Sequence, residues 1–272
     1  MKKGIFVLFL ALLLAGISAQ AQPVSKGLKV FISVDMEGIC GVINWDETSQ
    51  GGPDYPLFRK LMTQEANAAI EGALAAGATE ILVRDSHGSG RNILPDLLRP
   101  EARLLRDWTY GPLSMMEGID KSFDAVIFIG YHARAGTPDA VLKHTMTLSI
   151  YDVVILVSGD QAIAQQAKEL FGEVEGVIVK EAIATAAIML SPARAQELIR
   201  TKTTAALKRL KDFKPYKLNP PYTLEVVYTD EAMAVKASWI PGAVRTSARS
   251  VSFTSNDFME MLKLWRLARN VG

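Results

Sequence analysis

The sequence of 272 residues contains a single cysteine, Cys40, and only three histidines. One cysteine excludes an intrachain disulfide framework and any zinc or iron–sulfur site built from several thiolates. Charge of one sign is not in excess either, because 30 lysine and arginine residues are balanced by 29 aspartate and glutamate residues. This balance excludes a strongly basic nucleic-acid-binding protein and an acidic disordered tail. The Gly-x-Ser-x-Gly motif of serine hydrolases is also absent.

The N-terminal hydrophobic run is short. It covers residues 5–15 after the basic start MKK, which is less than a membrane-spanning helix needs. Two small residues, Ala19 and Ala21, then stand where a signal peptidase reads the chain. We therefore expect residues 1–21 to be a secretory signal peptide, which leaves no stable membrane span after cleavage. The pattern is typical of bacteria and predicts a secreted or periplasmic protein; an uncleaved N-terminal anchor is the alternative.

After this segment, short apolar runs rich in β-branched residues alternate with helical patterns. A helix is predicted at 57–76, and strands are predicted at 28–34, 80–84, 125–130, 153–157 and 176–180. Strands that alternate with helices are typical of an α/β protein with a mostly parallel, three-layer sheet. We expect this α/β domain to cover residues 27–190.

The pattern changes in the last third of the chain. A helix is predicted from Pro192 to about residue 210, with Ser191 as its N-cap. Three prolines within 214–221 then exclude regular structure. The remaining predicted elements are two antiparallel strands at 224–228 and 250–253 and a closing helix at 257–269. Residues 191–272 are therefore expected to form a smaller α+β domain.

Carboxylates and histidines follow three of the predicted strands. Asp35 and Glu37 come directly after the first strand, and their i, i+2 spacing projects both to one face of an extended segment. His87 follows the second strand and His132 the third. The C-terminal ends of parallel strands lie along one edge, where open α/β sheets bind ligands. Carboxylate oxygens and imidazole nitrogens together suit zinc or a similar divalent ion.

Each of these residues also has a purely structural interpretation. Asp35 and Glu37 can be solvated carboxylates at a strand end. His87 can pair with Asp85, and His132 can be the packed edge of an aromatic cluster. The metal site is favoured because two of the three histidines and a carboxylate pair stand at the same end of successive strands, whereas chance would scatter them.

The third histidine, His144, follows His132 by twelve residues. This separation is too long for a pair of ligands on one helix, but it allows the chain to return over the same edge of the sheet. A histidine that lies beside a metal without binding it is a natural proton donor or charge stabiliser in hydrolysis. The alternative is a surface histidine beside Lys143.

Seven short motifs extend over almost the whole chain after the N-terminal segment. They are 33–39 (SVDMEGI), 84–87 (RDSH), 114–118 (SMMEG), 130–135 (GYHARA), 144–146 (HTM), 191–195 (SPARA) and 241–242 (PG). Together they resemble the zinc D-aminopeptidase family of the dipeptide-operon type. The first motif, with His87 and His132 in register, is the most specific part of the resemblance.

The resemblance implies a peptidase with two zinc ions that removes N-terminal D-amino acids from short peptides. It also implies two-domain subunits in a ring-like homo-oligomer. The charge balance had already indicated that nucleic acid is not a partner. By motif, Asp35 would be the carboxylate shared between the ions, with Glu37, His87 and His132 as further ligands. His144 matches the active-site histidine of the family. Metal-assisted hydrolysis is the implied mechanism.

The sequence departs from the family after His144. The family carries a Gly-Glu-x-Gly-x-Asn stretch and a helix there, and its glutamate is the remaining zinc ligand. Here residues 145–152 (TMTLSIYD) run directly into the predicted strand at 153–157, so this glutamate is absent. Loss of one of five ligands is expected to weaken the binding of one metal ion more than that of the other.

Three explanations of the missing segment stay open. The first is an internal deletion that impairs the enzyme. The second is a site that works with one zinc ion, or with Asp152 or Asp160 as a substitute ligand. The third is a non-catalytic peptide- or metal-binding relic. Another metallohydrolase, such as a phosphoesterase, is a further alternative. The leading expectation is zinc-dependent hydrolysis of N-terminal D-amino acids from short peptides, impaired to the extent that the lost ligand matters.

Overall fold

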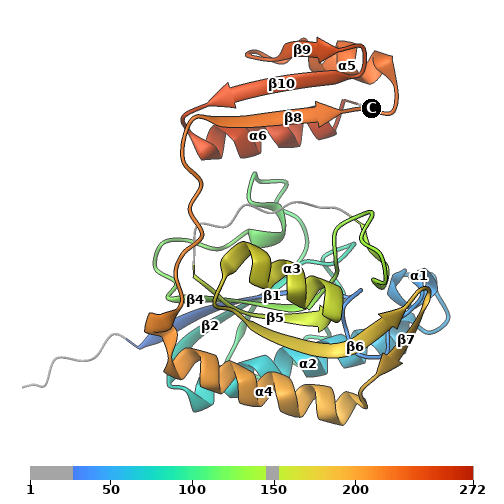
Figure 1. Ribbon diagram of the computed structural model, residues 1–272. Helices are drawn as coiled ribbons and strands as arrows, with labels where there is room; N and C mark the ends of the chain where they lie inside the picture. Colours follow the sequence, from blue (N-terminus) through green and yellow to red (C-terminus); the bar gives the residue numbers. More distant parts are fainter. Residues whose placement is uncertain (1–26, 145–152, 272) are drawn as a thin grey trace, which may run out of the picture.

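The computed structural model describes residues 27–144 and 153–271 (Figure 1). The expected signal peptide at 1–21 and the segment 145–152, with the candidate ligand Asp152, lie outside the described residues. No helix in the described ranges is long and apolar enough to cross a membrane.

A seven-stranded sheet with the order β3-β2-β1-β4-β5-β6-β7 forms the centre of the molecule. Its strands are β1 (Leu28–Val34), β2 (Ala78–Asp85), β3 (Arg103–Leu105), β4 (Ala125–Tyr131), β5 (Val154–Asp160), β6 (Glu175–Ile183) and β7 (Ala186–Met189). Neighbouring strands are parallel except for β6 and β7, which are antiparallel. The predicted fold class, α/β with a mostly parallel sheet, is confirmed.

Helices cover both faces of this sheet and make it the middle of three layers (Figure 1). The elements around it are α1 (Trp45–Thr48), α2 (Tyr55–Ala75), the short 3-10 helix η1 (Ser114–Met116), α3 (Gln161–Phe171) and α4 (Pro192–Lys208). Alternate residues of β1 belong to different cores: Val30 and Ile32 pack in the core that contains α2 and α4, whereas Phe31 packs in the one that contains α3. Because β1 is buried on both faces, its side chains must be apolar on both, which explains the continuous apolar run from which this strand was predicted.

A smaller unit follows, connected by an extended segment that contains the prolines (Figure 1). It consists of the 3-stranded antiparallel sheet β8-β10-β9 with two helices, and its elements are β8 (Tyr222–Val227), α5 (Glu231–Ala237), β9 (Val244–Ser247), β10 (Ser250–Ser255) and α6 (Phe258–Arg269). The helix α6 lies on the side of this sheet that faces the main domain. The unit has its own apolar core, which includes Val251, Phe253 and Met261.

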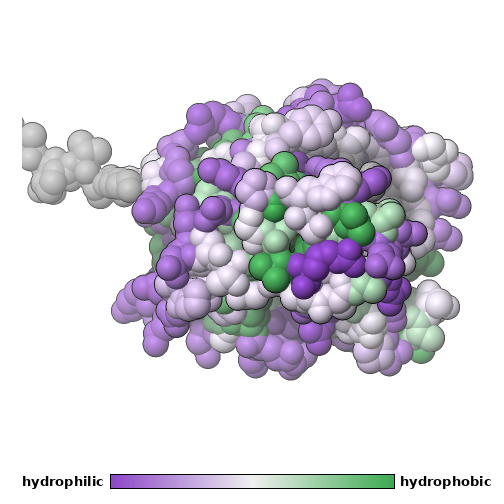
Figure 2. All heavy atoms as spheres, turned by 90° about the horizontal axis from the view of Figure 1, so that it is seen from above, coloured by the Kyte–Doolittle hydropathy of each residue, from purple (hydrophilic) through white to green (hydrophobic). Residues whose placement is uncertain are grey.

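The outer face of the small unit carries apolar side chains. Figure 2 looks down on this unit and shows hydrophobic residues gathered in the middle of the face, with hydrophilic residues around them. The large apolar side chains that are exposed on the unit are Val227, Trp239, Val244 and Leu267.

The helix α4 belongs to the main domain by its packing. Ser191 caps it as predicted, accepting a hydrogen bond from the backbone N–H of Arg194. Its buried residues, which include Ala195 and Ile199, lie in the same core as α2 and the central sheet. A short 3-10 helix, η2 (Leu210–Asp212), follows it. The second apolar core begins only beyond the prolines at 214–221, whereas the predicted boundary after residue 190 lies before α4.

Contact between α2 and α4 depends on a glycine. A Cβ atom at Gly72 of α2 would lie 2.5 Å from the carbonyl oxygen of Arg200 and 2.7 Å from Cβ of Thr203. We expect Gly72→Ala to lower the free energy of unfolding by up to about 2 kcal/mol, because a clash of about 1–3 kcal/mol offsets or outweighs the gain in helix propensity of about 1 kcal/mol. Urea denaturation measures the change.

Gly51→Ala is the matched control, because a Cβ atom there meets open space. This variant is expected to stay within about 0.5 kcal/mol of the wild type. A Gly72→Ala protein that is more stable than the wild type would show that the helices are not in close contact.

Candidate metal centre

The first candidate ligands stand at the end of the central strand β1, which pairs with β2 on one side and β4 on the other. The backbone N–H of Asp35 donates to the carbonyl of Ile129 at 2.8 Å, and that of Gly38 donates to the carbonyl of Gly130 at 2.7 Å. Gly130 has a φ of +69°, and a Cβ atom there would lie 2.3 Å from the carbonyl oxygen of Asp35. Only glycine therefore lets the end of β4 approach the acidic segment this closely.

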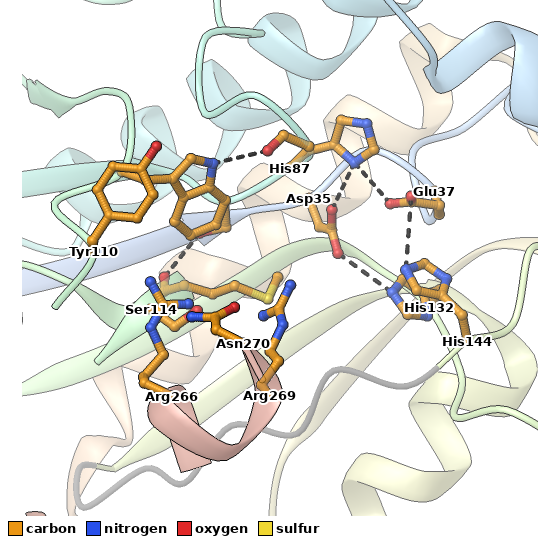
Figure 3. A pocket seen from close by; sticks show the side chains of 14 residues that line it. Asp35, Glu37, His87, Tyr110, Ser114, His132, His144, Arg266, Arg269 and Asn270 are labelled. Carbon is orange, nitrogen blue, oxygen red and sulfur yellow. Dashed lines mark hydrogen bonds and ion pairs between the residues drawn. The ribbon is translucent and has the colours of Figure 1, made fainter. Parts of the chain in front are cut away.

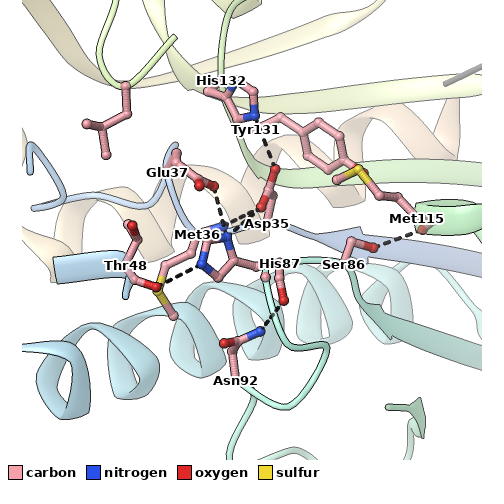
Figure 4. Close-up of polar contacts among 12 residues, drawn as sticks. Asp35, Met36, Glu37, Thr48, Ser86, His87, Asn92, Met115, Tyr131 and His132 are labelled. Atoms are coloured by element: carbon pink, nitrogen blue, oxygen red, sulfur yellow. Dashed lines mark hydrogen bonds and ion pairs between the residues drawn. The ribbon is translucent and has the colours of Figure 1, made fainter. Parts of the chain in front are cut away.

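Four of the five candidate residues form one cluster (Figure 4). His87 Nδ1 lies 3.1 Å from Asp35 Oδ1 and 3.0 Å from Glu37 Oε2. His132 Nε2 lies 3.6 Å from Asp35 Oδ2. One ligand atom each from Asp35, Glu37 and His132 lie within 4.8 Å of one another. Both carboxylates are only 3% exposed, so water solvates them poorly.

The electrostatics of the cluster favour positive charge between the carboxylates. Burial and the neighbouring Glu37 carboxylate raise the pKa of Asp35 to about 7. Burial opposes ionisation of Glu37 as well, but its contact with His87 outweighs burial and holds the pKa of Glu37 below its usual value. Burial likewise disfavours a charged His87, yet both carboxylates raise its pKa well above the ordinary value. Two buried carboxylates thus hold a shared proton on the imidazole, where a cation can take its place.

In each imidazole, the nitrogen that points away from the carboxylates donates a hydrogen bond to a backbone carbonyl. His87 Nε2 donates to the carbonyl of Thr48 at 2.9 Å, and His132 Nδ1 donates to the carbonyl of Ala133 at 3.0 Å. In both rings the other nitrogen faces the carboxylates. Histidines that bind metals show this arrangement, because the outer hydrogen bond fixes the orientation of the ring and its tautomer. The donor set of two carboxylates and two oriented imidazoles therefore fits zinc.

The alternative interpretation of His87, in which it pairs with Asp85, does not match the contacts in the structure. Asp85 accepts hydrogen bonds from the backbone N–H groups of Asn92 and Ile93 and from the Asn92 side chain. Asp85 therefore organises the loop after β2, and His87 contacts Asp35 and Glu37 instead of Asp85.

His144 lies beside the cluster and outside the ligand group. Its ring stacks on that of His132, with 3.7 Å between centroids and 15° between planes. Nε2 lies 4.0 Å from Glu37 Oε1, and Nδ1 donates to the carbonyl of Leu142 at 2.8 Å. The side chain is 41% exposed. It therefore presents Nε2 next to the carboxylates at a place that solvent and substrate can reach.

Asp160 is not brought to the cluster. It ends β5, and one of its oxygens accepts from the backbone N–H of Ile163 as the N-cap of α3, at 2.9 Å. The other accepts from the backbone N–H of Val141 at 2.8 Å. Both oxygens are therefore engaged in positioning the chain, which argues against Asp160 as the substitute ligand.

A buried lysine that sequence reasoning missed supports the metal-binding loop. Lys180 of β6 is 2% exposed, and its Nζ donates to the carbonyls of Glu37 at 2.6 Å, Ile39 at 3.1 Å and Val42 at 2.6 Å. Burial lowers the pKa of Lys180 to about 8. The sequence shows a charged residue at the end of the predicted buried strand 176–180, which is a signal for such a role. It does not show which carbonyl groups accept its hydrogen bonds.

A pocket of about 400 Å³ opens next to the cluster (Figure 3). The five candidate residues line it on the side of the main sheet. The other residues that line it are Ser86, Gly88, Trp108, Tyr110, Ser114, Met115, Arg266, Arg269 and Asn270. The last three come from the end of α6 and the residue after it, so the small unit contributes to the wall of the pocket.

Comparison with known proteins shows which proteins this chain resembles. A profile of the family described as D-aminopeptidase matches residues 28–155 and 153–267. A D-aminopeptidase of Bacillus subtilis (strain 168) is 36% identical in an alignment over 260 residues, and the match covers 86% of this chain and 93% of that protein. A solved structure, described as a Zn-dependent D-aminopeptidase DppA from Bacillus subtilis and a self-compartmentalizing protease, is 32% identical with a TM-score of 0.83. The match covers 90% of this chain and 97% of that one.

The role of Lys180 can be tested by Lys180→Met, which keeps the length of the side chain and removes the three hydrogen bonds. Because three buried carbonyls lose their donor, we expect the free energy of unfolding to fall by about 2–4 kcal/mol. Zinc affinity should fall as well, because the loop that carries Glu37 is no longer held. Denaturation and zinc titration with a competing chelator measure the two effects.

Lys168→Met, at an exposed position of α3, is the control and is expected to change neither quantity measurably. Wild-type zinc affinity in a stably folded Lys180→Met protein would contradict the role of this lysine in the centre.

Proposed function

The chain belongs to the D-aminopeptidase family, and from this membership we propose that it hydrolyses N-terminal D-amino acids from short peptides with zinc as its cofactor. The observation that carries the proposal is the buried cluster in which two carboxylates and the inner nitrogens of two histidines face one another. The similar solved structure is described as Zn-dependent, which supports zinc as the metal.

We assign the metal-binding roles to Asp35, Glu37, His87 and His132. Asp35 stands between the two histidines, with Oδ1 towards His87 and Oδ2 towards His132, so it is the group that two ions would share. Zinc bound there supplies a Lewis acid for the scissile carbonyl and lowers the pKa of the attacking water.

His144 is proposed to move the proton of the reaction. Hydrolysis bonds the oxygen of water to the carbonyl carbon, breaks the C–N bond and transfers a proton to the leaving amine. Because Nδ1 of His144 donates to a backbone carbonyl, Nε2 is the atom that takes up and returns this proton at the pocket.

The absent glutamate bears on the number of zinc ions. The two matched ranges of the family profile overlap at residues 153–155, directly after the segment 145–152 in which the resemblance leads us to expect this ligand. Asp35, Glu37 and His132 offer three donors to one ion, whereas a second ion beside His87 has fewer protein donors among the described residues. We propose one tightly bound zinc ion per chain and a second that binds weakly.

The missing ligand also supports a second candidate function, that of a metal- or peptide-binding protein without catalysis. The same pocket and the same cluster serve this function, so only activity distinguishes the two.

We further propose a homo-oligomer in a secreted or periplasmic location. The similar solved structure is described as self-compartmentalizing, and the small unit exposes Val227, Trp239 and Val244 on its surface. Exposed apolar groups of this kind are typical of surfaces between subunits. The expected location rests on the N-terminal sequence pattern alone.

Activity and metal dependence test the proposal together. The purified chain is expected to release D-alanine from D-Ala-D-Ala, to lose this activity after chelation and to regain it with zinc. Asp35→Asn should bind zinc at least tenfold more weakly, because it removes the charge shared between the ligands. Amino-acid release is followed by chromatography and zinc by elemental analysis.

The outcomes separate the candidates. Tight zinc binding without peptide cleavage would support the binding protein, and cleavage of phenyl phosphate but not of peptide would support a phosphoesterase. Two zinc ions of equal affinity would contradict the weakened second site.

The role of His144 is tested by His144→Ala. We expect kcat for D-Ala-D-Ala to fall by about 10²–10⁴-fold, because the group that moves the proton is lost. Zinc content should stay at the wild-type value, since this side chain is not a ligand. Lys143→Ala, at the exposed neighbouring position, is the control and should retain activity. Peptide cleavage at the wild-type rate in His144→Ala would refute the assignment.

A further inference from the structure

The two ends of the pocket carry opposite charge. Asp35 and Glu37 lie at one end, and Arg266 and Arg269 of α6 line the other (Figure 3). A short peptide with free termini is itself a zwitterion, with an ammonium group at one end and a carboxylate at the other. Because Asp35 and Glu37 are assigned to the metal, the positive end of the pocket is the part that is complementary to a terminus of such a peptide, namely its carboxylate.

The groups at the positive end suit a carboxylate. A guanidinium group presents parallel N–H donors that match the two oxygens of a carboxylate. Both guanidinium groups lie near the ring of Trp265. The distance from Cζ to the ring centroid is 5.9 Å for Arg266 and 5.4 Å for Arg269, and a cation–π contact of this kind helps to orient the guanidinium groups. The Asn270 side chain, which also lines the pocket, carries further N–H donors.

A buried hydroxyl in the same wall is an independent observation. Ser114 of η1 is 3% exposed, and its Oγ has no hydrogen-bond partner among the described residues. It lines the pocket near Arg266 and Asn270 (Figure 3). Its φ of +53° is a costly conformation for a residue other than glycine. Such strain together with an unpaired donor is typical of a position that binds a ligand.

We propose that Ser114, Arg266, Arg269 and Asn270 form a subsite for the free C-terminal carboxylate of the substrate. The inference rests on the proposed function and extends it, because it makes the small unit the part of the chain that selects short peptides with a free C-terminus. The metal centre acts on the N-terminal residue, and the subsite holds the opposite end of the same peptide.

The experiment compares D-Ala-D-Ala with D-Ala-D-Ala amide, which has the same length and lacks the terminal charge. The wild type is expected to show a kcat/KM at least tenfold higher for the acid than for the amide. Arg266→Met should bring this ratio close to one, mainly through KM for the acid, and Arg266→Lys should retain part of the preference. Lys263→Met, at an exposed position of the same helix, should preserve the wild-type ratio.

A basic residue in the last turn of α6 also stabilises the helix dipole, so stability is measured on each variant. A loss of stability lowers activity towards acid and amide alike, whereas loss of the subsite changes their ratio. An acid-to-amide ratio near one in the wild type, or an unchanged ratio in Arg266→Met, would overturn the proposal.

The two proposals fail in different ways. If the wild type cleaves neither peptide, the proposed function is wrong, and the subsite is then judged from binding of the two peptides by calorimetry. Tighter binding of the acid that Arg266→Met abolishes supports the subsite, and equal binding of the acid and the amide refutes it.

Discussion

The centre of this protein depends on the need of two buried carboxylates for positive charge. Asp35 and Glu37 are almost completely removed from water at the end of the central strand, so their charges are costly unless a cation or a proton compensates them. Nδ1 of His87 lies within hydrogen-bond distance of both, and these contacts raise the pKa of His87 well above its ordinary value, which favours a positive charge at this place. A zinc ion meets the same demand with a larger charge.

The surrounding structure holds these carboxylates in a buried position that is unfavourable for a charged group. The ammonium group of Lys180 binds three carbonyls of the loop that begins at Glu37, and Glu65 accepts from the backbone N–H of Cys40 in the same loop at 2.8 Å. On the other side, Gly130 allows the backbone of β4 to approach. The loop is therefore fixed from both sides before any ligand binds, which is what a metal centre requires of its supporting residues.

The division into two units assigns the chemistry and the selectivity to different parts of the chain. The main sheet supplies every candidate metal ligand, because the ends of β1, β2 and β4 meet at one edge. The small unit supplies Arg266 and Arg269, which reach the pocket from the end of α6. With this arrangement, the two units meet at one pocket, and each contributes side chains of a different chemistry to its wall.

The amino-acid sequence alone determined the five central strands of the main sheet, their parallel arrangement and the expectation of a cluster at its edge, but not the short strands β3, β7 and β9. A short apolar run that is soon followed by Asp35 or His87 is informative by itself, because a polar group after a buried strand leaves the sheet at its C-terminal edge. Tertiary structure decided the rest. The helical pattern of α4 shows an apolar face but not which sheet it packs against. The short edge strand β7 has too few residues to show a period. Lys180, Ser114 and Arg266 come close to the centre only because distant segments pack together, and no local spacing encodes such contacts.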